Sequence, residues 1–341
     1  MKTRVAINGI GRVGRAFFRL AHKHPELEVV AANDLGSLEN IAYLLKFDTV
    51  YGRSEFDIEV KDGNLLIAGK TIKFFSEKDP LNLPWKDLDI DVVIESTGFF
   101  TEFEKAKAHI DAGAKRVVIT APVHDDHKNT EEEGTILMGV NEKELETCII
   151  TSNASCTTNA ASPLIAILDE AIGIEKALLN TTHALTNSQP TVDSPNKKDF
   201  REGRAGAHNM VPSSTGAAIA VTKAFPKLLN LFDGIAVRVP VAAGSLVDVT
   251  FISKTDTTKE EVNEILKKAS VDPRWKDIFT VTEEEIVSSD ILGSTFGSIA
   301  DLNLTRVVGG NLVKVMAWYD NEMGYCQTLV DHVAKLGNSL K

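Results

Sequence analysis

Residues 3–18 read TRVAINGIGRVGRAFF, and this stretch decides the fold. The apolar run over residues 3–8 predicts a strand, and apolar residues recur at helical spacing in the segment that follows. Gly9, Gly11 and Gly14 join the two as a GxGxxG pattern. Such glycines permit a tight turn and the close approach of a pyrophosphate to a helix N-terminus. The stretch therefore predicts a dinucleotide-binding turn.

An acidic residue at the right distance supports this reading. Asp34 lies 20 residues after Gly14, at the end of the next predicted strand. A carboxylate there can hold the 2′-hydroxyl of an adenosine ribose, and it repels a 2′-phosphate, so NAD is favoured over NADP. A GxGxxG pattern alone often marks nothing but a turn. Strand, helix and spaced acid together favour dinucleotide binding over that alternative.

The first half of the chain alternates strands and helices. Strands are expected at 3–8, 27–34, 89–98 and 115–122, and helices at 11–24, 37–48 and 102–113, the second with a Ser37 cap. This alternation predicts a parallel sheet with helices on both faces, a doubly wound fold of the Rossmann type.

The pattern changes after about residue 155. Segments 234–241, 245–253 and 311–320 alternate at period two, with few helices between them. In 234–241 the alternation puts four apolar residues on one face and Arg238 on the other. Such strands suit a mixed or antiparallel sheet with two differently used faces. Residues 321–337 read as a closing helix ended by Gly337.

These patterns predict an α/β protein of three parts. Residues 1–154 would form the NAD-binding domain, and residues 155–320 an α+β catalytic domain with a mixed or antiparallel sheet. Residues 321–341 would form a C-terminal helix that packs back on the NAD domain.

Composition excludes several classes of function. The 341 residues carry a net charge of −11, which argues against nucleic acid or an anionic membrane surface as the main partner. No apolar stretch of about 18 residues is present, so no membrane span is expected. Three unevenly spaced cysteines form neither a disulfide framework nor a metal-ligand set. We expect a cytoplasmic protein with no metal.

Cys156 stands out among these cysteines. It lies in NASCTTNAASP (153–163), among small polar residues at a predicted helix start. A free thiol with a pKa of about 8.5 is only a few per cent thiolate at neutral pH. A helix N-terminus contributes at most about 2 kcal/mol, near 1.5 pKa units, so full activation needs a second group. Pro163 does not suit a helix interior, which leaves a kink or a later helix start open.

His183 is a candidate for that second group. It ends an apolar, strand-like run and precedes a polar turn, which suits a side chain directed into a cleft. Taken singly, each residue has a more ordinary interpretation. Cys156 alone reads as a structural thiol at a helix cap, and His183 alone as a hydrogen-bonded histidine of the core or surface.

Six motifs together resemble one family. INGIGRVGR, SNASCTTN, THALT, SSTGAAIAV, AVRVP and WYDNEMGY match phosphorylating glyceraldehyde-3-phosphate dehydrogenase, in that family's order and close to its spacing. The 27-residue interval from Cys156 to His183 also agrees, and the resemblance covers essentially the whole chain. It implies an NAD-dependent enzyme of glycolysis and gluconeogenesis, which converts D-glyceraldehyde 3-phosphate and inorganic phosphate into 1,3-bisphosphoglycerate.

The resemblance also implies roles for individual residues. Cys156 would attack the aldehyde carbon, and His183 would raise its nucleophilicity and accept the hydroxyl proton. The residues implied for NAD are Gly9, Gly11, Arg12, Val13, Gly14, Asp34, Lys78, Thr97, Gly98, Thr120 and Asn321.

Two phosphate sites follow from the same resemblance. Arg238, Thr186 and Ser188 would hold the substrate's own phosphate, for which a guanidinium with hydroxyl donors is suitable chemistry. The residues implied for inorganic phosphate are Ser155, Thr157, Thr215 and Gly216. Without the resemblance, SSTG reads as a plain helix cap and Arg238 as a charge on a strand surface.

The long polar segment 187–209 resembles one that packs at subunit contacts in the family, so a homotetramer is expected by similarity. Erythrose-4-phosphate dehydrogenase, which shares fold and nucleophile, is the closest alternative activity. A nucleotide-sensing or RNA-binding protein without catalysis is an alternative of another class. The intact Cys156, His183 and phosphate motifs argue against it.

Overall fold

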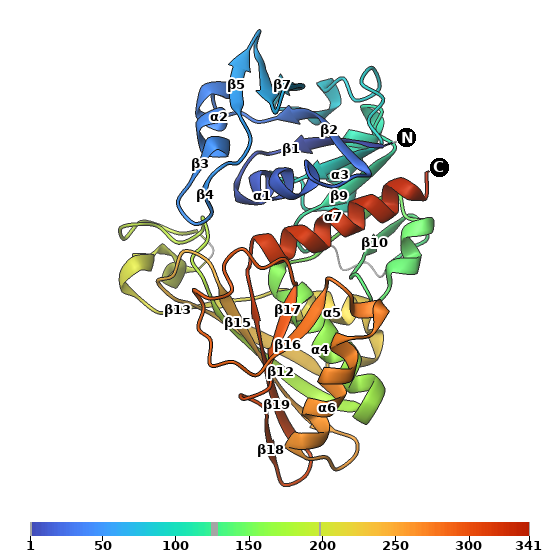
Figure 1. Cartoon of the computed structure of the whole chain (residues 1–341), viewed down its shortest axis with the longest axis vertical. Coiled ribbons are helices and arrows are strands. Elements are labelled where there is room, and N and C mark those ends of the chain that lie inside the picture. The colour runs from blue at the N-terminus through green and yellow to red at the C-terminus, as the bar shows by residue number, and fades with distance from the viewer. Residues whose placement is uncertain (1, 124–128, 198, 341) are drawn as a thin grey trace. The chain divides into compact units, whose positions relative to one another are not determined.

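The computed structural model describes residues 2–123, 129–197 and 199–340. The chain forms two compact units (Figure 1). Unit 1 contains Met1–Ile136, Asn141–Ala154 and Leu329–Lys341, and unit 2 contains Leu137–Val140 and Ser155–Thr328.

Among its described residues, unit 1 is built on a nine-stranded sheet. In chain order its strands are β1 (Thr3–Asn8), β2 (Leu27–Asn33), β5 (Ile58–Lys61), β6 (Asn64–Ile67), β7 (Lys70–Phe75), β8 (Val92–Glu95), β9 (Arg116–Ile119), β10 (Glu133–Thr135) and β11 (Ile150–Ser152). Their order across the sheet is β10-β11-β9-β8-β1-β2-β7-β6-β5, in which the pairs β5/β6 and β6/β7 are antiparallel and the other pairs are parallel. The run β7-β2-β1-β8-β9-β11 has the 3-2-1-4-5-6 order of dinucleotide-binding sheets, which confirms the Rossmann-type prediction.

The helices of unit 1 begin where the sequence predicts. They are α1 (Arg12–Ala21), α2 (Leu38–Lys46), α3 (Phe103–Asp111) and the C-terminal part of α7 (Met323–Asn338). Unit 1 also contains short 3₁₀ turns at Pro80–Asn82 and Glu142–Glu146, and a small hairpin of β3 (Phe47–Asp48) and β4 (Gly52–Arg53). Ser37 caps α2, since its side chain accepts a hydrogen bond from the Asn40 N–H. Local polar and apolar spacing is therefore enough to define these helices.

The glycine-rich turn is sterically obligatory. Gly9 has φ of 95°, and a Cβ on it would lie 2.7 Å from the backbone nitrogen of Thr97. A Cβ on Gly14 would lie 2.2 Å from the Gly9 carbonyl oxygen, whereas one on Gly11 would meet no protein atom within 4 Å. Gly9 and Gly14 are thus needed for the close packing of the turn, whereas the space beside Gly11 is open.

The closing helix does not end at Gly337 as predicted. Helix α7 continues to Asn338, and a Cβ on Gly337 would lie 2.2 Å from the Thr3 hydroxyl oxygen. The glycine therefore allows close packing of α7 against β1 and does not terminate the helix.

Unit 2 contains the predicted mixed sheet, with eight strands in the part of it that the structure describes. They are β12 (Ile174–His183), β13 (Val211–Ser214), β14 (Phe232–Arg238), β15 (Ser245–Ser253), β16 (Phe279–Thr282), β17 (Ser298–Asp301), β18 (Arg306–Val308) and β19 (Leu312–Tyr319). Their order is β13-β14-β12-β15-β19-β17-β16, with β18 beside β19. The pairs β12/β14 and β16/β17 are parallel and the others antiparallel.

Helices cover one face of this sheet, as Figure 1 shows. They are α4 (Cys156–Ile172), α5 (Ala217–Ala224) and α6 (Lys259–Ser270), with 3₁₀ turns at Phe200–Gly203, Gly206–His208, Pro226–Leu228 and Pro273–Trp275. On β12, Leu179 is buried under the helices, whereas Leu178 is 65% exposed on the other face. Alternation on β14 puts the predicted apolar face outward, since Ile235 is 56% exposed. Arg238 consequently shares the covered face with Ala236.

Helix α4 resolves the question raised by Pro163. The helix begins at Cys156, with Ser155 as its N-cap, and it runs through Pro163 to Ile172. The alternative of a later helix start is therefore wrong, and Cys156 occupies the first helical position. Along the described residues, none of the helices has both the length and the apolar character needed to cross a membrane.

A buried histidine makes unit 1 sensitive to acid. His332 on α7 is fully buried between the Thr151 hydroxyl (2.8 Å) and the Asn153 side-chain oxygen (3.1 Å), and burial lowers its pKa to about 3. The unfolded chain takes up this proton near pH 6.5 but the folded chain does not, so stability falls as the pH drops below 6.5.

We expect His332→Gln to reduce the loss of stability between pH 7 and pH 4.5 by about 2–3 kcal/mol. Urea unfolding at the two pH values measures this difference. His208→Gln, which changes an exposed histidine, is the control. An equal pH dependence in wild type and His332→Gln would contradict the prediction.

Candidate active site

The N-terminus of α4 presents Cys156 at the covered face of the sheet. Ser155 caps the helix, because its hydroxyl oxygen accepts a hydrogen bond from the Thr158 N–H at 3.1 Å. Cys156 follows at once and is partly exposed, whereas Thr157 is buried. The cap thus holds the sulfur beside the free N–H groups of the first turn.

His183 reaches the same place from the end of β12. Its Nε2 lies 3.3 Å from the Cys156 sulfur, and its side chain is buried with 3% exposure. Period-two alternation from Leu179 through Thr181 directs it to the face that α4 covers. The structure therefore brings together a thiol and an imidazole that are 27 residues apart in the sequence.

Arg238 lies on the other side of the imidazole. Arg238 and His183 are direct partners in the β12/β14 register, and the guanidinium Nη1 is 2.5 Å from His183 Nδ1. The Ala184 carbonyl oxygen also lies 2.7 Å from Nδ1. Nδ1 either donates to Ala184 or accepts from Arg238, and the choice decides whether Nε2 accepts the thiol proton or donates to the sulfur.

Burial sets the charge state of this pair. Desolvation, with the nearby Arg238 charge, lowers the pKa of His183 to about 3. Desolvation also raises the pKa of the Cys156 thiol, while Arg238 and the hydrogen bonds of Thr157 lower it. The net shift of the Cys156 pKa is therefore upward, whereas the sequence alone predicted that the helix N-terminus would lower it. At neutral pH the pair is a thiol beside a neutral imidazole, which can accept the thiol proton when its Nδ1 donates to the Ala184 carbonyl.

Tyr319 is a member of the site that sequence reasoning missed. Its hydroxyl lies 2.9 Å from the Thr157 hydroxyl and 2.8 Å from the Thr181 hydroxyl, and its ring packs edge-on to His183 at 5.9 Å. Burial raises its pKa, so it remains a neutral phenol. Its place at the buried end of an alternating strand, within WYDNE, was the available signal.

Asn321 follows β19 in the same unit. It is 7% exposed, and its side-chain oxygen accepts hydrogen bonds from the Gly244 N–H at 3.0 Å and the Ser245 hydroxyl at 3.2 Å. These bonds fix the orientation of the amide, so its NH₂ group points in a defined direction.

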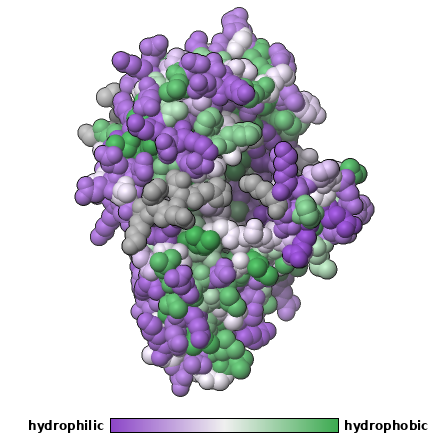
Figure 2. All heavy atoms as spheres, turned by 180° about the vertical axis from the view of Figure 1, so that it is seen from behind, coloured by the Kyte–Doolittle hydropathy of each residue, from purple (hydrophilic) through white to green (hydrophobic). Residues whose placement is uncertain are grey.

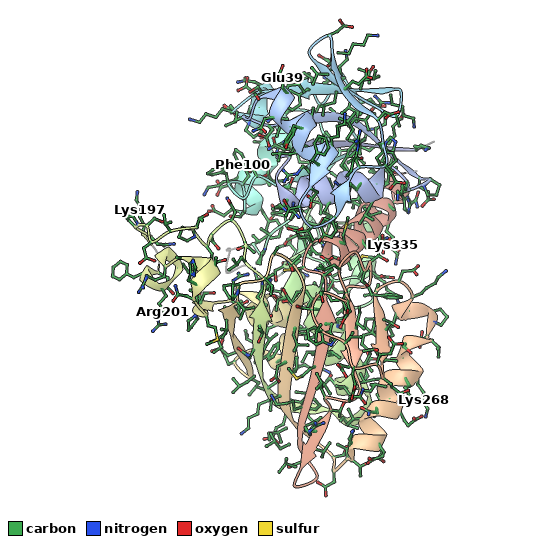
Figure 3. The ribbon with its side chains drawn as sticks, turned by 60° about the vertical axis from the view of Figure 1, so that its left-hand side comes forward. Glu39, Phe100, Lys197, Arg201, Lys268 and Lys335 are labelled. Atoms are coloured by element: carbon green, nitrogen blue, oxygen red, sulfur yellow. The ribbon has the colours of Figure 1, made fainter. Side chains whose placement is uncertain are left out.

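The predicted phosphate residues form separate hydroxyl groups in unit 2. The Thr186 and Ser188 hydroxyls lie 2.9 Å apart on an exposed turn, and both bond to Gln189. Thr215 bonds to the Ala217 N–H at 3.2 Å, at the start of α5, where Gly216 is the N-cap. Arg238 lies against His183 and not against these hydroxyls. Figure 3 shows the neighbouring segment with Lys197 and Arg201 standing away from the sheet.

The predicted cofactor residues of unit 1 gather at the carboxyl edge of its sheet. Asp34 accepts hydrogen bonds from the Ile10 N–H at 2.7 Å and the Gly36 N–H at 2.8 Å, so its carboxylate is held beside the glycine-rich turn. At this edge Thr97 and Gly98 follow β8, Thr120 follows β9 and Lys78 follows β7. On α1, Val13 is partly buried and Arg12 pairs with Asp48. The fixed acid and the open side of Gly11 fit an adenosine ribose and a pyrophosphate.

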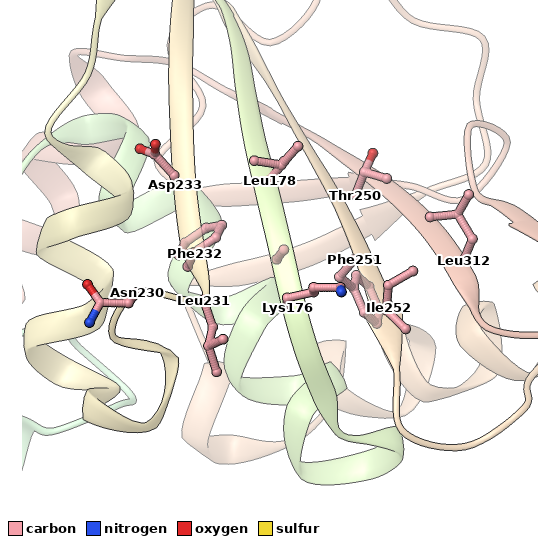
Figure 4. Close-up of a pocket in the computed structure, with 11 residues that line it drawn as sticks. Lys176, Leu178, Asn230, Leu231, Phe232, Asp233, Thr250, Phe251, Ile252 and Leu312 are labelled. Atoms are coloured by element: carbon pink, nitrogen blue, oxygen red, sulfur yellow. The ribbon is translucent and has the colours of Figure 1, made fainter.

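A pocket on the open face of the unit 2 sheet contains none of the predicted site residues. Its 11 lining residues include Leu178, Thr250 and Leu312, whose side chains project from the strands in Figure 4. Hydrophobic residues also reach the surface in Figure 2. Cys156 and His183 thus meet on the covered face of the sheet, and Leu178 and Leu312 are exposed on the open face.

Comparisons with known proteins point to one family. Residues 3–103 match the model described as glyceraldehyde 3-phosphate dehydrogenase, NAD binding domain, and residues 155–321 match its C-terminal domain. A glyceraldehyde-3-phosphate dehydrogenase from Clostridium pasteurianum is 47% identical over 96% of both chains. One from Streptomyces coelicolor is 46% identical over the full length of both.

Proposed function

Because the chain belongs to the glyceraldehyde-3-phosphate dehydrogenase family, we propose that Cys156 is its nucleophile and His183 its base. The enzyme oxidises glyceraldehyde 3-phosphate with NAD. The observation that carries the residue assignment is the 3.3 Å contact between the Cys156 sulfur and His183 Nε2. This is a hydrogen-bonded nucleophile–base pair when His183 Nδ1 donates to the Ala184 carbonyl, because Nε2 is then the nitrogen that accepts.

The chemistry follows from the neutral state of this pair. The Cys156 sulfur bonds to the aldehyde carbon while His183 takes the thiol proton and returns a proton to the carbonyl oxygen, which gives a thiohemiacetal. His183 then accepts the hydroxyl proton as the carbon is oxidised to a thioester. Bound NAD supplies the acceptor for the hydride. Inorganic phosphate attacks the thioester carbon, which forms an acyl phosphate and releases the Cys156 sulfur. The backbone N–H of Cys156 and the imidazole would stabilise the oxyanions.

Two anion sites serve the phosphate groups in this proposal. Arg238 with Thr186 and Ser188 holds the substrate phosphate, and the residues for inorganic phosphate are Ser155, Thr157, Thr215 and Gly216. The Arg238 guanidinium beside the His183 imidazole supports the first site. The Ser155 hydroxyl at the start of α4 and the Thr215 hydroxyl at the start of α5 support the second. Tyr319 positions Thr157 in this arrangement.

In this proposal unit 1 binds NAD at the carboxyl edge of its sheet. Asp34 binds the adenosine ribose, the turn with Gly9, Gly11 and Gly14 receives the pyrophosphate, and the Asn321 amide orients the nicotinamide carboxamide. The remaining contacts are Arg12, Val13, Lys78, Thr97, Gly98 and Thr120.

We also propose the assembly and the domain division. The enzyme would be a cytoplasmic homotetramer with an NAD-binding domain at 1–154, a catalytic domain at 155–320 and a C-terminal helix at 321–341. The exposed apolar residues Leu178, Ile235 and Leu312 on the open face of the unit 2 sheet support subunit contacts there.

The rate of NADH formation tests the phosphorylating reaction. With glyceraldehyde 3-phosphate and NAD, we expect sustained turnover only when inorganic phosphate is present, because the thioester otherwise remains on Cys156. Turnover that is indifferent to phosphate would exclude this mechanism. Erythrose 4-phosphate serves as the comparison substrate, and the relatives do not favour it. Faster turnover of erythrose 4-phosphate would overturn the substrate assignment.

A further inference from the structure

A row of polar side chains crosses the carboxyl edge of the unit 1 sheet. Asn33, Asn8 and Glu95 end the adjacent strands β2, β1 and β8, and they are direct partners in the strand register. Residues paired in a parallel sheet point to the same face, so the three side chains lie side by side. The Asn33 amide donates to Asn8 at 2.7 Å, and the Asn8 amide donates to Glu95 at 2.6 Å. All three are at most 4% exposed.

Glu95 accepts four hydrogen bonds at its end of this row. Its Oε2 accepts from Asn8 and from His109 Nε2 at 3.0 Å, and its Oε1 accepts from the backbone N–H and the hydroxyl of Thr97 at 2.8 and 2.5 Å. A carboxylate offers about four lone-pair sites, and four donors fill them. A glutamine has only one acceptor oxygen and cannot replace it. A buried carboxylate is costly unless every site is satisfied, so its presence here points to a role that an amide does not fill.

Trp85 fixes the direction of the hydrogen bonds. Its indole N–H donates to His109 Nδ1 at 3.0 Å, and an indole nitrogen can only donate. His109 Nδ1 must therefore accept, which leaves the proton on Nε2, facing Glu95. Trp85 and His109 are fully buried, so this tautomer is locked by packing.

The row ends at the loops that face the cofactor edge. Glu95 accepts hydrogen bonds from both donors of Thr97, its N–H and its hydroxyl, next to Gly98, whose φ is 76°. At the other end, the Asn33 side chain bonds to the backbone N–H and carbonyl of Glu77 at 2.8 and 2.9 Å. Asn33 and Glu77 directly precede Asp34 and Lys78. One buried chain of hydrogen bonds thus connects three loops at the switch point between β1 and β8, where such sheets bind ligands.

We propose that Trp85, His109 and Glu95 are positioning residues for NAD, which act through Asn8 and Asn33 to hold these loops in their binding geometry. The inference rests on the proposed placement of NAD at Asp34 and Thr97. A preorganised site binds more tightly because fewer groups must be ordered on binding. Removing the support loosens the loops without touching Cys156 or His183, so NAD affinity changes and the chemistry does not.

Titration calorimetry with NAD and steady-state kinetics test this on the full-length enzyme, well below each variant's unfolding temperature. We expect Glu95→Gln to raise the Kd and KM for NAD about 10- to 100-fold, the range seen when supporting partners behind metal ligands are removed, while kcat at saturating NAD is unchanged. His109→Leu should behave likewise. His109→Gln, which restores a donor to Glu95, should recover most of the affinity. Comparison of His109→Leu with His109→Gln tests the same role if Glu95→Gln does not fold.

Two further variants separate the possible failures. Val117→Ala removes buried volume from the same core and should lower the unfolding temperature with no change in NAD affinity. Asp34→Ala reports on the placement of NAD itself. If Asp34→Ala weakens NAD binding and Glu95→Gln and His109→Leu only lower stability, the positioning role is wrong and the proposed function stands. If Asp34→Ala leaves NAD binding unchanged, the placement of NAD is wrong. A parallel fall in kcat would also overturn the positioning role.

Discussion

Cys156→Ser is expected to abolish NADH formation, with a fall in kcat of at least about 10⁴-fold. A serine hydroxyl is far less acidic than a thiol, and a neutral imidazole whose pKa is lowered to about 3 is a weak base for it. Without the covalent intermediate, neither the oxidation nor the attack by phosphate can proceed on the enzyme. Absorbance of NADH under saturating substrates measures the loss.

NAD binding provides the control for this variant. Cys156→Ser should bind NAD with unchanged affinity by titration calorimetry, because the sulfur is not among the proposed NAD contacts. Cys148→Ala is the matched cysteine variant, since Cys148 is buried in unit 1 and burial raises its pKa to about 11. It should retain activity. Substantial turnover by Cys156→Ser would remove Cys156 from the nucleophile role.

His183→Asn is expected to lower kcat by about 10²- to 10⁴-fold, the usual contribution of a positioned general base. The raised pKa of the Cys156 thiol leaves little thiolate at pH 7, so proton transfer to His183 must accompany the attack. The asparagine keeps a polar group of similar size but cannot accept that proton.

Alkylation of Cys156 by iodoacetamide isolates this role from the rest of the reaction. In His183→Asn, alkylation should be slower near neutral pH and should rise with pH, since only the thiolate then reacts. His208→Asn changes an exposed histidine and should react like wild type. Equal alkylation rates at neutral pH in wild type and His183→Asn would exclude histidine as the activating group.

Much of the fold and part of the site follow from local sequence patterns. Gly9 and Gly14 signal the turn because only glycine fits there, and Ser37 and Ser155 signal helix starts because their hydroxyls cap free N–H groups. Alternation also identifies β14 and β15 as strands. It could not tell which face of β14 the helices cover, and the apolar face proved to be the open one.

The sequence by itself determined the strand and helix order, the glycine-rich turn and the position of Cys156 at a helix start, because each depends on neighbours within a few residues. Only the tertiary structure decided what surrounds these groups. The β12/β14 register puts Arg238 beside His183, and a slip of one residue would turn either side chain to the opposite face. Desolvation by distant segments reverses the expected direction of the Cys156 pKa, and the bond between Asn8 and Glu95 spans 87 residues. Burial and long-range hydrogen bonds depend on which segments pack together, and local spacing does not contain that information.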